Sequence, residues 1–164
     1  MNYKKPIAAT AVSTADATVG PTSPPANITE FNTIVGLIFA QLYESFPVSV
    51  DLIDRDGIAR AMGVTGEWSA HRLPSGRTFS EMLAYTMAWL SAQRYTMSNG
   101  AHPAERVTLT DNGLAALNRM PQGLTGTVGS ELVKAKSETG RRDWSGFGDL
   151  VGGIIGGYQK SITS

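Results

Sequence analysis

Apolar side chains recur every three or four positions between residues 28 and 46, which is the spacing of one buried face of an α-helix. Asn27, followed by Glu30 three residues later, has the form of a capping box at the start of this segment. Pro47 follows the last periodic position, and proline cannot continue a helix. The pattern therefore predicts a long amphipathic helix over residues 28 to 46.

A short strand and a short helix are expected next. The β-branched run Val48 to Val50 favours a brief strand. Asp51 or Asp54 can cap the helix, and Gly63 is suited to end it. The apolar residues expected on its inner face are Leu52, Ile58, Ala59 and Met62.

A third helix is predicted after a loop over residues 64 to 77, which contains glycine and proline. Thr78 and Glu81 form a T-x-x-E capping box at its start. The residues expected to line its buried side are Phe79, Met82, Leu83, Thr86, Met87 and Leu90. The outward side would then carry Ser80, Glu81, Ala84, Tyr85, Ala88 and Gln93.

The period changes to that of strands after the third helix. Residues 94 to 98 and 105 to 109 predict two strands, and the connection between them contains Asn-Gly and a proline. This pattern indicates a β-hairpin with a long tip. Thr110 can cap a fourth helix that ends before Pro121, with Leu114, Ala115, Leu117 and Met120 as its apolar residues.

The two ends of the chain differ from its middle. Residues 1 to 27 are rich in Ala, Thr, Ser and Pro, so they predict a flexible tail that cannot bury enough apolar surface to fold. Residues 121 to 164 predict a short polar helix over 130 to 138, followed by a glycine-rich segment from 144 to 162.

The glycine-rich segment has a repeat of its own. Gly148, Gly152 and Gly156 recur at a spacing of four, which on a helix makes a smooth stripe that another helix can approach closely. Ile154 and Ile155 supply apolar surface beside it. We expect the segment to pack on its own domain or on a twin subunit, with a mobile tail as the alternative. The apolar run is too short to favour membrane insertion.

The order helix, short strand, helix, helix, hairpin, helix resembles the winged-helix form of the helix-turn-helix. The most specific piece is Trp89-Leu90 followed by Tyr95, the hairpin, and the run Val107 to Leu114. This piece is similar to the passage from wing to following helix in winged-helix proteins of the MarR and PadR kinds. The resemblance covers roughly 90 of the 164 residues.

The resemblance implies a mainly α protein with a small β-hairpin. Its winged-helix domain would span residues 28 to 120, between a tail at 1 to 27 and a helical, glycine-rich extension at 121 to 164. One departure affects docking. The join between the second and third helices, residues 64 to 77, is much longer than the usual turn of three or four residues.

Composition excludes several kinds of chemistry. The chain has no cysteine and two histidines, which rules out disulfides, thiolate metal sites and metal sites built on several histidines. No G-x-S-x-G elbow and no phosphate-binding P-loop occur. We therefore expect a cytoplasmic protein that is not an enzyme, has no cofactor and does not enter the membrane.

The net charge of the chain does not favour binding of nucleic acid, so any such binding depends on a local group of basic residues. Fourteen basic and 14 acidic residues cancel, so only a local patch could bind phosphate. Arg72 and Arg77 precede the third helix, Arg94 and Arg106 bracket the hairpin, and His102 lies at its tip. In winged-helix complexes these parts approach DNA. However, the outward side of the third helix has no Arg or Lys before Arg94.

Two functions follow as hypotheses. The first is a DNA-binding transcriptional regulator, as a dimer, that uses the arginines and His102. The second is a winged-helix module for protein–protein assembly. In that case the segment containing Gly148, Gly152, Gly156, Ile154 and Ile155 would mediate homo-oligomerisation or docking on a protein partner. Fold alone does not decide between them.

Overall fold

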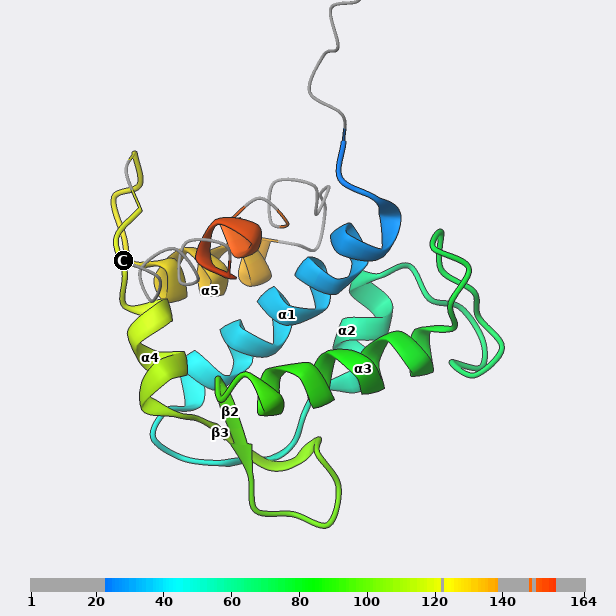
Figure 1. Cartoon of the computed structure of the whole chain (residues 1–164), viewed down its shortest axis with the longest axis horizontal. Helices are drawn as coiled ribbons and strands as arrows, with labels where there is room; N and C mark the ends of the chain where they lie inside the picture. The colour runs from blue at the N-terminus through cyan, green and yellow to red at the C-terminus, as the bar shows by residue number, and fades with distance from the viewer. Residues whose placement is uncertain (1–22, 122, 139–147, 149, 156–164) are drawn as a thin grey trace, which may run out of the picture.

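The computed structural model describes residues 23–121, 123–138, 148 and 150–155. Residues 1–22 of the tail predicted at 1–27 lie outside them, and residues 26 and 27 belong to a helix rather than to a tail. The chain is mainly helical with a small three-stranded antiparallel sheet (Figure 1). This confirms the prediction of a mainly α protein that contains a small β-hairpin. The elements are α1 (Ala26–Ser45), β1 (Val50–Leu52), α2 (Arg55–Ala61), α3 (Phe79–Ala92), β2 (Thr96–Ser98), β3 (Glu105–Leu109), α4 (Asp111–Leu117) and α5 (Val128–Glu138). Residues 150–155 are also helical.

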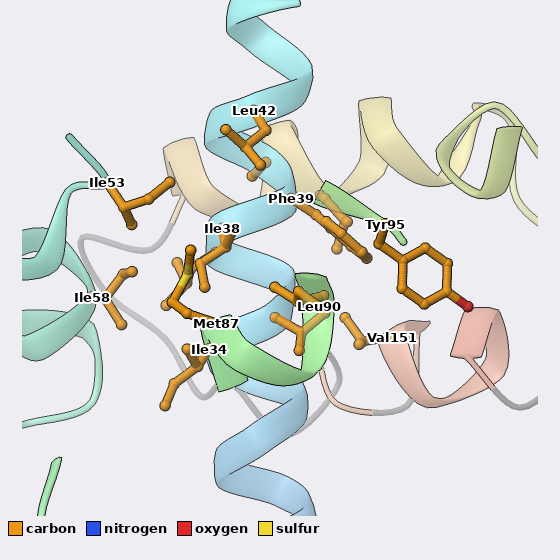
Figure 2. Packing of buried hydrophobic residues seen from close by; sticks show 14 of the residues in the cluster. Ile34, Ile38, Phe39, Leu42, Ile53, Ile58, Met87, Leu90, Tyr95 and Val151 are labelled. Atoms are coloured by element: carbon orange, nitrogen blue, oxygen red, sulfur yellow. The ribbon is translucent and has the colours of Figure 1, made fainter. Parts of the chain in front are cut away.

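Helix α1 forms the centre of the core. Most of its side chains between residues 32 and 42 are buried, and Ile34, Ile38 and Phe39 have no exposed surface. The sequence predicted a single buried face, but residues 32 to 40 are buried around the whole helix, so α1 needs cover on all sides. Figure 1 shows α3 and α5 on opposite sides of α1. Figure 2 shows side chains from α3 and from the segments at residues 53–58 and 151 pointing toward it.

The predicted start of α1 is wrong in one respect. The helix begins at Ala26, its N-cap is Pro25, and no side chain caps it. Glu30 does not turn back to Asn27. Its Oε1 accepts a hydrogen bond of 2.8 Å from the backbone N–H of Ser75. The side chain is 5% exposed, so the contact with a distant loop replaces the local cap that the sequence favoured.

The sheet has β3 in its middle, with β1 and β2 as antiparallel neighbours on either side. The first strand was predicted at residues 48 to 50, but it forms at Val50–Leu52 because it pairs with β3. Leu52, expected on the inner face of α2, therefore faces Glu105 and is 48% exposed. The predicted hairpin is confirmed, although β2 begins only at Thr96.

The residues predicted to begin and end α2, and those predicted to begin α3, are confirmed. Asp54, and not Asp51, caps α2 by accepting from the backbone N–H of Gly57 at 2.8 Å. Gly63 follows the helix with a φ of +69°, a conformation that glycine adopts without steric cost. The capping box between Thr78 and Glu81 is present at the start of α3.

Helix α4 is tied closely to the end of α3. The Thr110 hydroxyl caps α4, accepts from Gly113 at 3.2 Å and donates to the backbone carbonyls of Arg94 and Tyr95. A side chain at Gly113 would collide with the Tyr95 carbonyl oxygen. The junction therefore needs a hydroxyl at Thr110 to accept from the Gly113 N–H, and it needs glycine at position 113 because a side chain there has no room.

The inner face predicted for α4 is partly wrong. Ala115 is exposed, whereas Ala116 is buried. Met120 lies beyond the end of the helix at Leu117 and is 67% exposed. The helix is only seven residues long, and its buried side consists of Gly113, which lies against the Tyr95 carbonyl, together with Ala116 and Leu117.

The core continues beyond residue 120. Val128 and Leu132 of α5 are buried in it, together with Val151 and Ile154. Helix α5 was expected from residue 130 and begins at Val128. Gly129 lies flat against the ring of Tyr43, so close that a side chain at this position would overlap the ring.

We predict opposite effects of two Gly→Ala substitutions. Gly113→Ala should lower the free energy of unfolding by about 1–3 kcal/mol, because the added methyl group has no room. Gly153→Ala is the matched control. This glycine is helical and exposed, with no heavy atom within 4 Å of an added Cβ, so alanine should leave stability unchanged or raise it by up to about 1 kcal/mol. Chemical denaturation measures both, and equal effects would contradict the packing of α4.

Candidate nucleic-acid interface

A tight turn carries the first two candidate arginines to the start of α3. Arg72 and Thr78 pair in an isolated antiparallel bridge. Inside the bridge, the backbone N–H of Leu73 donates to the Arg77 carbonyl at 2.8 Å, and that of Gly76 donates to the Leu73 carbonyl at 2.8 Å. The Arg72 guanidinium also donates to the Gly76 carbonyl at 2.7 Å. Both arginines are exposed on a hydrogen-bonded turn.

Helix α1 holds this turn through a buried carboxylate. Glu30 accepts from the Ser75 N–H in the middle of the turn, and its second oxygen, Oε2, is buried without a hydrogen-bond partner. A buried carboxylate is costly unless a specific contact offsets the loss of water. Glu30 therefore fixes the turn with its two arginines against the core. Sequence reasoning assigned Glu30 to a cap and missed this role.

The preceding part of the loop is also anchored. The Trp68 ring packs edge-on against Phe79 at 5.6 Å between centroids, and the Arg55 guanidinium lies 5.8 Å from the centroid of the Trp68 ring. The long join between α2 and α3 is thus held at Trp68 and again at Ser75.

One exposed aromatic side chain stands on the outward side of α3. Tyr85 is 57% exposed, and the Arg77 guanidinium lies 5.4 Å from the centroid of its ring. At an exposed site such a cation–π contact favours this arrangement of the two side chains by about 0.5–1 kcal/mol. Sequence reasoning placed Tyr85 on the outward side but did not pair it with Arg77.

The acidic residue on the same side is engaged by its own helix. Glu81 accepts from the N–H and the hydroxyl of Thr78, both at 2.9 Å. These hydrogen bonds, followed by the nearby charges of Arg77 and Arg72, lower the pKa of the Glu81 carboxyl from its ordinary value. The remaining outward residues within α3 are small and uncharged, namely Ser80, Ala84, Ala88, Ser91 and Ala92, and all are exposed, as is the C-cap Gln93.

Arg94 occupies a backbone position that glycine usually fills. Its φ is +57°, its N–H donates to the Ser91 carbonyl at 3.0 Å, and the Tyr95 N–H donates to the Leu90 carbonyl at 2.9 Å. This is the Schellman motif that ends many helices, usually with glycine in the left-handed position. A residue with a side chain there carries a steric cost that structures often tolerate at functional sites.

The hairpin supplies the remaining candidates. Arg106 is exposed in β3 with a φ of +50°, and its carbonyl accepts from the Asn99 N–H at 3.2 Å. His102 is exposed in the connecting loop. The Ser98 hydroxyl lies 2.6 Å from the Glu105 carbonyl oxygen and 3.0 Å from that of His102, so it fastens the base of this loop.

A groove lies between the end of α3, strand β2 and the start of α4. Its volume is about 630 Å³, and Arg94, Ser98, Asp111 and Asn112 contribute to its polar lining. Arg94 is thus placed where the helix meets the hairpin. Asp111 adds a negative charge to the same groove.

None of the four candidate arginines forms an ion pair within the part of the chain that the structure describes. The ion pair found there joins Lys136 of α5 to Glu44 of α1, with 2.8 Å between Nζ and Oε2. The guanidinium groups of Arg72, Arg77, Arg94 and Arg106 thus lie outside ion-pair distance of the described carboxylates, although the charges of Arg77 and Arg72 act on Glu81.

The glycine stripe lies partly inside the molecule. The Asn32 side chain of α1 donates to the Gly148 carbonyl at 3.2 Å, and an added Cβ at Gly152 would lie 3.4 Å from the Asn32 amide nitrogen. Ile154 is buried in the core, and Ile155 is half-buried. Gly156 is not among the described residues.

No helix in the described ranges is both long and apolar enough to cross a bilayer. In the same ranges, no three His, Asp or Glu side chains gather where they could hold a metal ion. Comparison with protein-family models, curated proteins and solved structures gives no match. The assignment of function therefore depends on the residues and geometry above.

We predict that Arg94→Gly stabilises the fold. Glycine adopts the left-handed position without steric cost, so the free energy of unfolding should rise by about 1 kcal/mol. Gly63→Arg is the mirror control. Gly63 ends α2 with the same pair of hydrogen bonds and has open space around it, so this change should lower stability by about 1 kcal/mol. A loss of stability in Arg94→Gly, seen by chemical denaturation, would mean that the fold needs the arginine side chain.

Proposed function

We propose that the chain is a winged-helix DNA-binding protein that acts as a transcriptional regulator. Helix α3 would be the recognition helix and the β2–β3 hairpin the wing. The order of elements from α1 to β3 and the central place of β3 in the sheet support this proposal. The observation that carries it is the set of exposed arginines at both ends of α3 and in the hairpin, none paired with a described carboxylate.

The length of α3 suits such a contact. A helix of 14 residues is about 21 Å long, whereas the major groove is about 12 Å wide. Arginines at the two ends of this helix can therefore approach phosphates on both sides of the groove. Arg72 and Arg77 would contact one strand, and Arg94 and Arg106 the other.

The small number of arginines sets the expected salt dependence. Four phosphate contacts correspond to a slope of about −4 in a plot of log K against log salt concentration. The chain as a whole has no net charge, so no further attraction adds to these local contacts.

We predict that Arg77→Ala and Arg106→Ala each weaken duplex DNA binding and make the slope shallower by about one unit. Fluorescence anisotropy with a labelled duplex across a range of salt concentrations measures both effects. Lys134→Ala is the control, because this exposed lysine lies on α5, across α1 from α3 (Figure 1). Its slope should match that of the unaltered protein. Absence of binding by the unaltered protein even at low salt would exclude DNA binding.

The second candidate function is protein–protein assembly. The uncharged outward side of α3 and the exposure of Val48 (69%) and Met120 (67%) favour it. Sedimentation and light scattering on the same samples separate the two. A stable oligomer without DNA binding supports the assembly module, whereas a dimer that binds DNA supports the regulator.

A further inference from the structure

The outward side of α3 limits which base edges the helix can contact. Its exposed side chains between the ends are Ser80, Glu81, Ala84, Tyr85 and Ala88. Guanine is recognised in the major groove by Arg or Lys, and adenine by Asn or Gln. This surface has none of these four residue types before Gln93, the C-cap.

Contacts with cytosine are also disfavoured. An acidic side chain can accept a hydrogen bond from the cytosine amino group. Glu81 is the acidic residue on this surface, and it is turned back to the N–H and hydroxyl of Thr78 at 2.9 Å each. Its carboxylate serves the capping box at the start of the helix.

The other exposed side chains of this surface include Ala84, Tyr85 and Ala88. They suit the methyl group of thymine, which apolar and aromatic side chains contact in the major groove. The methyl groups of Ala84 and Ala88 are exposed and small enough for close approach. Tyr85 lies beside them, 57% exposed, with its ring held under the Arg77 guanidinium. An exposed ring that is already oriented loses little freedom on binding.

The charges beside this surface favour a duplex nucleic acid as its partner. Arg72 and Arg77 stand at one end of α3 and Arg94 at the other, and none is paired with a described carboxylate. An apolar protein helix laid on this side would leave these charges unmatched, whereas the phosphates of a duplex would complement them.

We infer that Tyr85, with Ala84 and Ala88, recognises thymine methyl groups and gives the protein a preference for duplex DNA rich in A·T pairs. The inference depends on the proposed DNA-binding function. It adds the chemistry by which α3 distinguishes one duplex from another.

The test compares two duplexes of the same A·T-rich sequence, one with thymine and one with deoxyuridine. Deoxyuridine pairs with adenine in the same way but lacks the C5 methyl group. The unaltered protein should bind the thymine duplex more tightly by about fourfold for each methyl group that it buries. Anisotropy titrations at one fixed salt concentration give the ratio of the two Kd values.

Three variants locate the effect. Tyr85→Ala should bind both duplexes nearly equally and keep the salt slope of the unaltered protein, whereas Tyr85→Phe keeps the ring and should keep the thymine preference. Met120→Ala removes an exposed apolar side chain outside α3 and should also keep the preference. Because Tyr85 is exposed, its removal should leave the fold intact, which circular dichroism checks.

The outcomes separate the inference from the proposed function. Absence of binding to either duplex at low salt overturns both. Binding with equal affinity for thymine and deoxyuridine, or for A·T-rich and G·C-rich duplexes, overturns the inference and leaves DNA binding in place. A thymine preference that survives in Tyr85→Ala would overturn the role of Tyr85.

Discussion

The burial of α1 on all its sides is the constraint on which the rest of the structure depends. Ile34, Ile38 and Phe39 have no exposed surface, so α1 needs neighbours in every direction. Helices α3 and α5 cover opposite sides, and residues 150–155 complete the cover with Val151 and Ile154 (Figures 1 and 2). Because one side of α3 packs on α1, its other side is left to face solvent with the residues that we assign to DNA.

The few polar side chains buried along α1 define how the surrounding segments attach. Glu30 accepts a hydrogen bond from the turn that carries Arg72 and Arg77. Asn32, two residues after Glu30 in α1, donates a hydrogen bond to the Gly148 carbonyl. Burial of a polar group without a hydrogen bond costs free energy, so the contacts of Glu30 with Ser75 and of Asn32 with Gly148 favour this placement of the two segments. Helix α1 thus connects the candidate interface with the C-terminal segment.

Sequence signals succeeded where neighbouring residues decide the structure. The Thr78 capping box, the Asp54 cap and the Thr110 cap each depend on atoms three residues away, and the structure confirms them. Predictions failed where a distant segment offered a better partner, as β3 did for Leu52 and Ser75 did for Glu30. The arginines could be assigned to the ends of α3 from the order of elements. The contact of Arg77 with Tyr85 could not be predicted from the sequence, because it depends on the conformation of the turn between Arg72 and Thr78.

The proposed DNA binding by a neutral chain would differ from that by a strongly basic one. Its phosphate contacts would be limited in number, so contacts with the bases would have to contribute a larger share of the affinity. Arg94 and Arg106 both lie at positive φ, where a side chain is sterically costly, and both lie beside the hairpin. The uncharged outward side of α3, between Arg77 and Arg94, would then supply discrimination among sequences through apolar contact.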